Sequence, residues 1–190
     1  MAGNYISDQQ FKKLNCNSEP LELGEYENCA FIDCTFANLD FSGYLFADCS
    51  FIGCDLSMVN LSNASFREVK FKDCKLLGLH FEHCNPFLFE VSFSNCNLNL
   101  ASFFRLKMKK TQFQSCNLRE CDFSECDLSS SNFNESDLLD ATFDNTILEK
   151  TDFRNARYYQ IDPESNHIRK ARFSTDGLSG LLLKYDLDIE

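Results

Sequence analysis

The chain has 190 residues, with 29 acidic and 18 basic side chains and a formal net charge of −11. Its length fits a single domain, and its acidic balance argues against direct nucleic-acid binding, because neutralising phosphates requires Lys and Arg. The sequence lacks an apolar run long enough to cross a membrane and an N-terminal basic stretch followed by an apolar run, so we expect a cytoplasmic protein without membrane contact.

Residues 1–23 precede the main sequence pattern and are expected to form an N-terminal segment and cap. From residue 24 to residue 160 a large apolar residue, usually Phe or Leu, recurs at every fifth position, and a small residue commonly stands two positions before it. A period of five fits neither an amphipathic helix nor a half-buried strand, so the sequence is a repeat array. The large residues are Phe31, Phe36, Phe41, Phe46, Phe51, Leu56, Leu61, Phe66, Phe71, Leu76 and Phe81, and then Leu88, Phe93, Leu98, Phe103, Met108, Phe113, Leu118, Phe123, Leu128, Phe133, Leu138, Phe143, Leu148 and Phe153.

Four such units would close a square coil of twenty residues, with the large and small residues inside. Stacked coils then require columns of like residues, and the sequence contains them once a two-residue insertion is placed near residues 84–87, at Asn85 and Pro86. One column is Phe31, Phe51, Phe71, Phe93, Phe113, Phe133 and Phe153, and another is Phe36, Leu56, Leu76, Leu98, Leu118 and Leu138. A single coil cannot bury its ring of large residues alone, so stability must come from stacking.

Over about residues 26–158 this repeat resembles the pentapeptide-repeat family. The resemblance implies an all-β solenoid, specifically a right-handed quadrilateral β-helix.

Ten of the eleven cysteines stand at positions that match the small inward residue of the repeat, and Cys16 is the exception. A free cysteine behaves as a small buried hydrophobe, whereas disulfide scaffolds belong to shorter secreted chains. We therefore expect core packing rather than disulfides.

His80, His83 and Cys84 could bind zinc by residue type, but the histidines flank the inward Phe81 while Cys84 points inward, so the three would not converge. His167 stands without an evident nucleophile. The sequence offers no catalytic triad, Gly-rich phosphate loop or spaced carboxylate pair, and a rod lacks an enclosing cleft. We expect no enzymatic activity, no metal and no cofactor.

Charge is segregated along the chain. Residues 14–66 hold eight acids and no Lys or Arg, residues 67–110 hold eight bases and four acids, and residues 119–152 hold ten acids against Arg119 and Lys150. A preference for Asp at turns explains why the outward positions are polar, but it does not explain why acids and bases gather in different parts of the chain. The acids that we single out as a candidate binding surface are Glu120, Asp122, Glu125, Asp127, Glu135, Asp137, Asp140 and Asp144.

Residues 161–190 differ in kind from the repeat. Ser174 or Asp176 could cap a short C-terminal α-helix after the loop at Pro163. This helix would carry an apolar stripe that serves as a lid on the solenoid or as a dimer contact, and its size favours the dimer. The stripe comprises Leu178, Leu181, Leu182 and Tyr185, with Leu187 beyond them.

A pentapeptide rod that ends in an Asp-Pro segment and a short Leu-rich helix is similar to the gyrase-protecting proteins of the Qnr, MfpA and microcin B17 immunity type. That resemblance implies a homodimer joined through the C-terminal helices, which imitates B-form DNA in shape and charge. The implied partners are DNA gyrase and topoisomerase IV, with protection against quinolones or a peptide toxin. The larger Qnr proteins carry a long loop, whereas this chain has only the insertion at Asn85 and Pro86.

A second hypothesis is a protein-interaction scaffold with an unrelated partner, because a fold does not fix a function. Four apolar residues at outward positions fall on one column and could form its contact patch. They are Met58, Leu77, Leu100 and Leu139.

Overall fold

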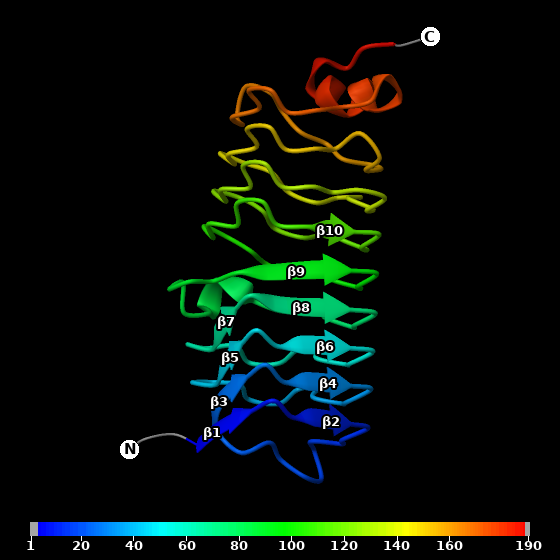
Figure 1. The fold of residues 1–190 in the computed structure, drawn as a ribbon. Coiled ribbons are helices and arrows are strands. Elements are labelled where there is room, and N and C mark those ends of the chain that lie inside the picture. Colours follow the sequence, from blue (N-terminus) through cyan, green and yellow to red (C-terminus); the bar gives the residue numbers. More distant parts are fainter. Residues whose placement is uncertain (1–3, 189–190) are drawn as a thin grey trace.

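The computed structural model describes residues 4–188, which wind in stacked four-sided coils to form a rod (Figure 1). This architecture confirms the expected all-β quadrilateral β-helix. The strands of this part of the chain are β1 (Asn4–Ser7), β2 (Gln10–Lys12), β3 (Gly24–Glu27), β4 (Ala30–Ile32), β5 (Leu45–Ala47), β6 (Ser50–Ile52), β7 (Ser65–Arg67), β8 (Val69–Lys72), β9 (Val91–Ser94) and β10 (Phe113–Gln114). Its 3₁₀ helices are η1 (Phe81–His83), η2 (Thr175–Leu181) and η3 (Leu183–Tyr185).

All strand pairs are parallel and lie on two of the four sides of the rod. The first side contains the sheet β1-β3-β5-β7, and the second contains β2-β4-β6-β8-β9-β10. On the other two sides single parallel bridges join neighbouring coils, as between Asn117 and Asp137 on the third side and between Ser102 and Asp122 on the fourth. Hydrogen bonds along the rod axis therefore occur on all four sides, with one interruption on the first side above the insertion segment.

The corners explain why the outward positions are rich in Asp and Asn. A residue with positive φ recurs at the corners, including Asp33 (φ 53°) and Asn63 (φ 58°), and these residue types tolerate the left-handed conformation better than most. Asp side chains also close turns locally, as where the Asp55 carboxylate accepts the Ser57 N–H at 3.0 Å. Part of the acidity of this chain thus serves its backbone.

The core is a set of stacked ladders. Phe133 and Phe153 lie 4.9 Å apart at an interplanar angle of 6°, while rings on adjacent sides meet edge to face. The Phe ladder extends one coil beyond each expected end, because Phe11 stacks on Phe31 at 5.0 Å and Phe173 stacks on Phe153 at 5.4 Å. The solenoid therefore begins within the expected N-terminal segment, near residue 4, and continues past residue 160 to Phe173.

The cysteines lie in the core as expected. All eleven are free and buried, and many thiols contact a backbone carbonyl oxygen, as Cys121 does with that of Leu98 at 3.1 Å. Cys16 is also fully buried, because its N–H bonds to the Thr35 carbonyl and so places it below Phe36 in the column of large residues.

The two-residue insertion lies on the outside of the rod. Phe71 pairs with Phe93 in regular register, so residues 84–90 contain the extra length. The expectation that Leu88 resumes the inward series is wrong: Leu88 is exposed and has positive φ. Phe89 instead packs against the core, 6.3 Å from the Phe81 ring.

The C-terminal helix is present but is a 3₁₀ helix, η2, followed by η3, and not the expected α-helix. Two glycines lie within η2, Ser174 gives no side-chain cap, and the Gly180 carbonyl accepts the Ile161 N–H at 3.0 Å. Both features disfavour an α-helix. Glycine has low helix propensity, and the Gly180 carbonyl bonds to the last coil instead of to a residue within the helix. Among residues 4–188, no helix has the length and apolar character needed to span a membrane.

Candidate functional site

The eight acids chosen from the sequence are spread around the rod, so they do not form a single face. Asp137 lies on the third side and Asp122 lies on the fourth. Asp127 lies on the first side, where it forms a parallel bridge with Lys107. Glu135 has positive φ and occupies a corner of the coil that follows β10. Sequence neighbours in a five-residue repeat point in different directions, which disperses a run of acids over four sides.

Three of these acids have a role in the turns. The carboxylates of Asp122, Asp127 and Asp137 each accept the backbone N–H two residues later, at 2.8, 3.1 and 3.0 Å. Charge reversal at these positions would disturb the coil as well as the surface.

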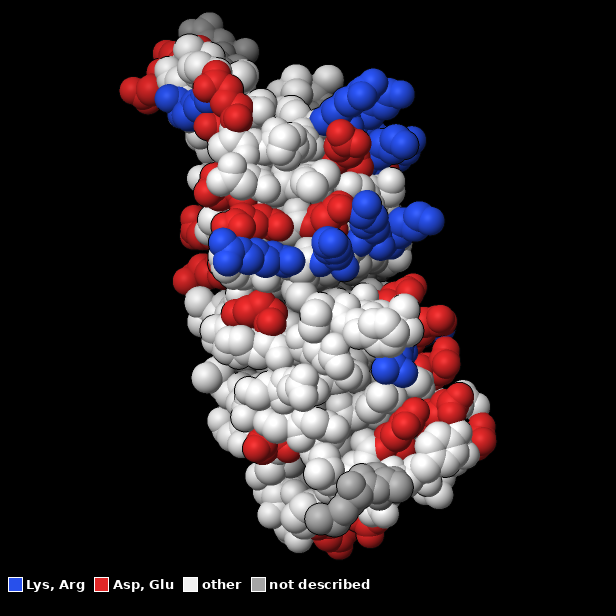
Figure 2. All heavy atoms as spheres, turned by 90° about the vertical axis from the view of Figure 1, so that its left-hand side faces the viewer, with Lys and Arg blue, Asp and Glu red and all other residues white. Residues whose placement is uncertain are grey.

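Three acids are neutralised by bases from the neighbouring coil. Arg105 forms a two-point contact with Glu125, at 2.7 and 3.1 Å, and its hydrogen bonds hold the pKa of Glu125 below the usual value. Arg119 pairs with Asp137 at 2.7 Å, and Lys109 pairs with Asp127 at 3.1 Å. Figure 2 shows the first side of the rod, where Lys and Arg gather over the C-terminal half among such acids.

Five acids remain. Four of them, Glu120, Asp122, Asp140 and Asp144, define a smaller surface along the fourth side, which we call the acidic corner, whereas Glu135 accepts a hydrogen bond from the Ser115 hydroxyl at 2.8 Å. Within residues 4–188 none of them has an ion-pair partner. Glu120 and Asp140 occupy equivalent corner positions in successive coils, because the Glu120 N–H donates to the Leu139 carbonyl and both residues have positive φ. Asp122 bridges to Thr142 on the adjoining fourth side.

The acidic corner borders the C-terminal lid formed by η2 and η3. Asp140, Thr142 and Lys184 line one groove of about 420 Å³ between the last coils and the lid. Lys184 lies 2.7 Å from both Asp162 and Glu164, and the Tyr185 hydroxyl donates to Glu164 at 2.8 Å. These contacts hold η3 against the rod.

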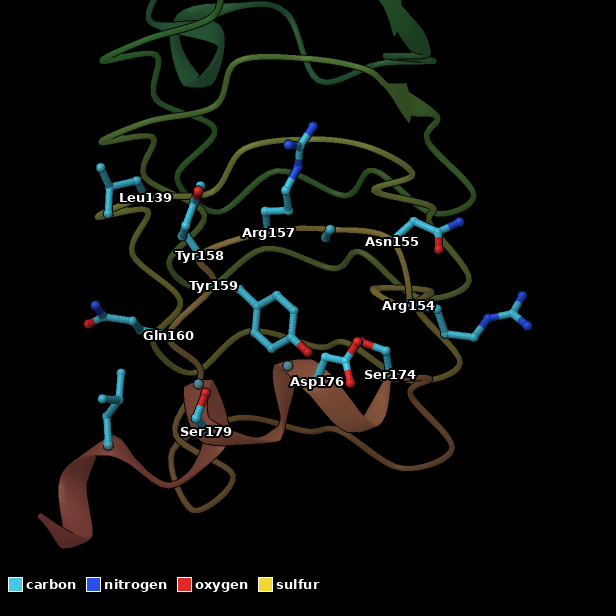
Figure 3. A pocket seen from close by; sticks show the side chains of 14 residues that line it. Leu139, Arg154, Asn155, Arg157, Tyr158, Tyr159, Gln160, Ser174, Asp176 and Ser179 are labelled. Atoms are coloured by element: carbon cyan, nitrogen blue, oxygen red, sulfur yellow. The ribbon is translucent and has the colours of Figure 1, made fainter. Parts of the chain in front are cut away.

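A second lid pocket, of about 540 Å³, surrounds Tyr159 (Figure 3). The Tyr159 ring packs on Phe153 and Phe173, and its hydroxyl points toward Ser174 and Asp176 at the start of η2. Burial raises the pKa of Tyr159. A Cβ atom at Gly177 would overlap this hydroxyl, so the glycine permits the close approach of the lid.

The predicted dimer stripe has two parts. Leu181 packs against the core and Leu182 is partly buried, so both belong to the lid. In the lid and the described tail, residues 175–188, the large exposed apolar side chains are Leu178, Leu183, Tyr185 and Leu187. The sequence analysis did not single out Leu183.

The structure brings together three of the four residues of the proposed apolar patch. Met58 and Leu100 are 61% and 58% exposed, and Leu77 lies between their coils. Met58 covers Gly78, where a Cβ atom would lie 2.6 Å from its sulfur. Leu139 is separated from Leu100 by the coil of Glu120.

The histidine cluster forms a local pair. The His80 and His83 rings stack at 5.3 Å, and His80 Nδ1 lies 2.9 Å from Glu82, while Cys84 is buried. Burial raises the pKa of several thiols, that of Cys49 to about 12, which makes them poor nucleophiles, whereas hydrogen bonding to Cys96 lowers the pKa of the buried Cys116. Within residues 4–188, no group of three potential ligands converges on a metal position.

Sequence models of one family match most of the chain. The model described as "Pentapeptide repeat region" matches residues 25–87, and the model described as "Pentapeptide repeats (8 copies)" matches residues 88–120 and 121–157. No curated protein sequence matches the chain.

Among solved structures, the chain is similar to HetL, a pentapeptide repeat protein involved in heterocyst differentiation regulation from the cyanobacterium Nostoc sp. strain PCC 7120. The identity is 18%, the match covers 93% of this chain and 90% of that chain, and the TM-score is 0.51. The chain is also similar to a trypsin-treated form of QnrB1, a plasmid-mediated fluoroquinolone resistance protein, at 18% identity over 99% of both chains with a TM-score of 0.47. At such identities the likeness is one of fold.

Proposed function

The chain belongs to the pentapeptide-repeat family, and from this premise we propose that it is a non-catalytic homodimer that binds DNA gyrase or topoisomerase IV in place of DNA. In this role it protects the enzyme against quinolones or a gyrase-directed peptide toxin. The observation that carries the proposal is the acidic corner, whose four carboxylates remain without ion-pair partners in the described part of the chain beside the C-terminal end of the rod.

Rod geometry supports this proposal. The ladder from Phe11 to Phe173 takes eight steps, which at about 4.8 Å per coil gives a length of about 40 Å. Two rods joined end to end would extend about 80 Å, a length over which DNA carries about 47 charges at one per 1.7 Å. The dimer carries −22, twice the −11 of one chain, so its acids must act locally and not along the whole rod.

The C-terminal end supplies the dimer contact. Leu178, Leu183 and Leu187 are 45%, 55% and 57% exposed at this end, and their burial against a second copy would remove apolar surface from water. The dimer would place two acidic corners near its centre, facing one continuous basic surface of the enzyme.

The test is gyrase supercoiling and quinolone-stabilised DNA cleavage with increasing amounts of protein. We expect both reactions to be inhibited by the wild type and not by Glu120→Lys/Asp140→Lys. A matched control is Asp48→Lys/Glu68→Lys, which changes the same charge at two stacked corner residues with positive φ in the N-terminal half. Equal behaviour of the two double variants, or an inactive wild type, would refute the proposal.

The apolar patch favours a second candidate, an interaction scaffold with an unrelated partner. Met58 and Leu100 form an exposed ridge on a rod whose other corners are mostly polar. If Met58→Ser/Leu100→Ser abolishes capture of a partner and leaves topoisomerase reactions unchanged, the result supports the scaffold function over topoisomerase binding.

A further inference from the structure

The two-residue insertion opens a groove on the first side of the rod. This groove has a volume of about 510 Å³ and lies between the insertion segment and the next coil. One wall contains Phe89 and Val91, and the other contains Lys107, Lys109 and Lys110. Figure 2 shows this side, with a largely uncharged surface below the first band of Lys and Arg. The groove thus combines a basic wall with a wall of apolar residues that also carries Glu90 and Ser92.

The backbone ladder is interrupted at this groove. One coil later the ladder is complete. The Asp127 N–H donates to the Leu106 carbonyl at 2.9 Å, and the Asp127 carbonyl accepts the Met108 N–H at 2.8 Å. The Ser129 carbonyl accepts the Lys110 N–H at 3.0 Å. The equivalent groups are the N–H and C=O of Lys107 and the C=O of Lys109. Within residues 4–188 no backbone hydrogen bond joins residues 86–90 to residues 106–110.

In the described part of the chain, the backbone hydrogen bonds from the insertion segment to another coil all go to the coil before it. The Asn85 N–H donates to the Ala64 carbonyl at 2.8 Å, and the Glu90 N–H donates to the Phe66 carbonyl at 3.0 Å. The segment therefore leaves the lower edge of the Lys107 coil open. An open strand edge is a template for pairing with another chain.

Side chains around the opening have two kinds of chemistry. Lys107 and Lys110 are exposed and, among residues 4–188, have no ion-pair partner, whereas Lys109 is held by Asp127 at 3.1 Å. In the insertion segment, Phe87 and Leu88 are 63% and 62% exposed. Phe87 is held in position by its N–H bond to the Asn85 side chain at 3.0 Å and by the Arg67 guanidinium, 5.5 Å from its ring.

We propose that this groove binds an extended peptide segment of a partner protein in which acidic residues alternate with large apolar residues. The peptide pairs its main chain with the Lys107 edge, as in β-strand addition. Because side chains alternate between the two faces of a strand, its carboxylates meet the lysines while its apolar residues contact Phe89 in the opposite wall of the groove. This site is opposite in charge to the acidic corner, so its ligand is not the basic surface that the proposed function requires.

The probe is a fluorescent, acetylated peptide of alternating Asp and Leu, titrated with the full-length protein and followed by fluorescence polarisation. We expect saturable binding that weakens with salt and is lost when alternate peptide amides are N-methylated. Lys107→Glu/Lys110→Glu should weaken binding by about tenfold, because each exposed charge pair contributes modestly.

The matched control is Lys70→Glu/Lys72→Glu, which reverses two exposed lysines in β8, where the ladder is complete. This control should bind the peptide as the wild type does. The proposal is overturned by absence of saturable binding, by equal binding of an Asn-Leu peptide, by equal loss in the control, or by equal binding of single-stranded oligothymidylate, which would indicate a general polyanion site. Circular dichroism verifies the fold of each variant.

Discussion

The rings of Phe71 and Phe93 stack 5.4 Å apart at an angle of 11°, although the chain between them is two residues longer than in the other coils. The ladder thus fixes the register of the core, and the extra length is displaced to the surface. The displaced segment leaves the next coil unpaired on the first side, so a constraint inside the rod creates the groove outside it.

The same ladder predicts a steep dependence of stability on buried rings. Phe113 is fully buried between Phe93 and Phe133, at 5.3 and 4.8 Å. Phe113→Ala should lower the free energy of unfolding by about 3–5 kcal/mol, because both transfer and cavity terms are lost. Urea denaturation followed by circular dichroism measures it. Phe87→Ala, at an exposed ring, is the control and should change it by no more than about 0.5 kcal/mol; similar effects of the two changes would contradict the ladder model.

The lid predicts a compensating pair of substitutions. Gly177→Ala should loosen the lid, because its Cβ atom would overlap the Tyr159 hydroxyl. This hydroxyl is buried without a hydrogen-bond partner in the described residues, so Tyr159→Phe alone should be neutral or slightly stabilising. The double variant should recover part of the loss, because the Cβ atom would still lie 2.7 Å from the ring carbon Cζ of residue 159. Hydrogen exchange of the Ile161 amide, which bonds to the Gly180 carbonyl, reports lid opening. If the effects of the two substitutions on this exchange rate are simply additive, the clash lies elsewhere.

The sequence predicted the coil because its signal is repeated, and it missed features that occur once. Phe11 and Phe173 extend the ladder, but neither is embedded in a run of repeats. Leu88 and Phe89 are neighbouring apolar residues, so periodicity could not decide which one turns inward.

The eight predicted acids are dispersed over the rod for a geometric reason. Residues near one another in the sequence lie on different sides, whereas partners lie about one coil apart, as Arg105 and Glu125 do. Applying the twenty-residue period to the charges would have paired these residues in advance. The contact of Lys184 with Asp162 follows no period and needed the structure.

The buried thiols predict slow labelling. Burial raises the pKa of Cys16 to about 11 and that of Cys49 to about 12, so almost no thiolate exists at neutral pH. Hydrogen bonding to Cys96 lowers the pKa of Cys116, but this thiol is buried like the others. A thiol-reactive disulfide reagent should therefore react only as fast as the rod opens, and all eleven cysteines should react in urea. Thr142→Cys, at an exposed position, is the positive control and should react at once. Rapid reaction of the wild type would contradict the packing.

Acid should release η3 through the loss of its ion pairs. Hydrogen bonds from Lys184 hold the pKa values of Asp162 and Glu164 below their ordinary values. A lowered acid pKa stabilises the folded state above the unfolded value, about 4 for these residues, and that contribution is lost as the pH falls through the folded value. The NMR signals of Tyr185, whose hydroxyl bonds to Glu164, should therefore shift to those of a free tail below about pH 4. Lys184→Met should show the free-tail signals already at neutral pH, because the ammonium that lowers both pKa values is absent. If the variant keeps the same acid transition as the wild type, other carboxylates control the tail.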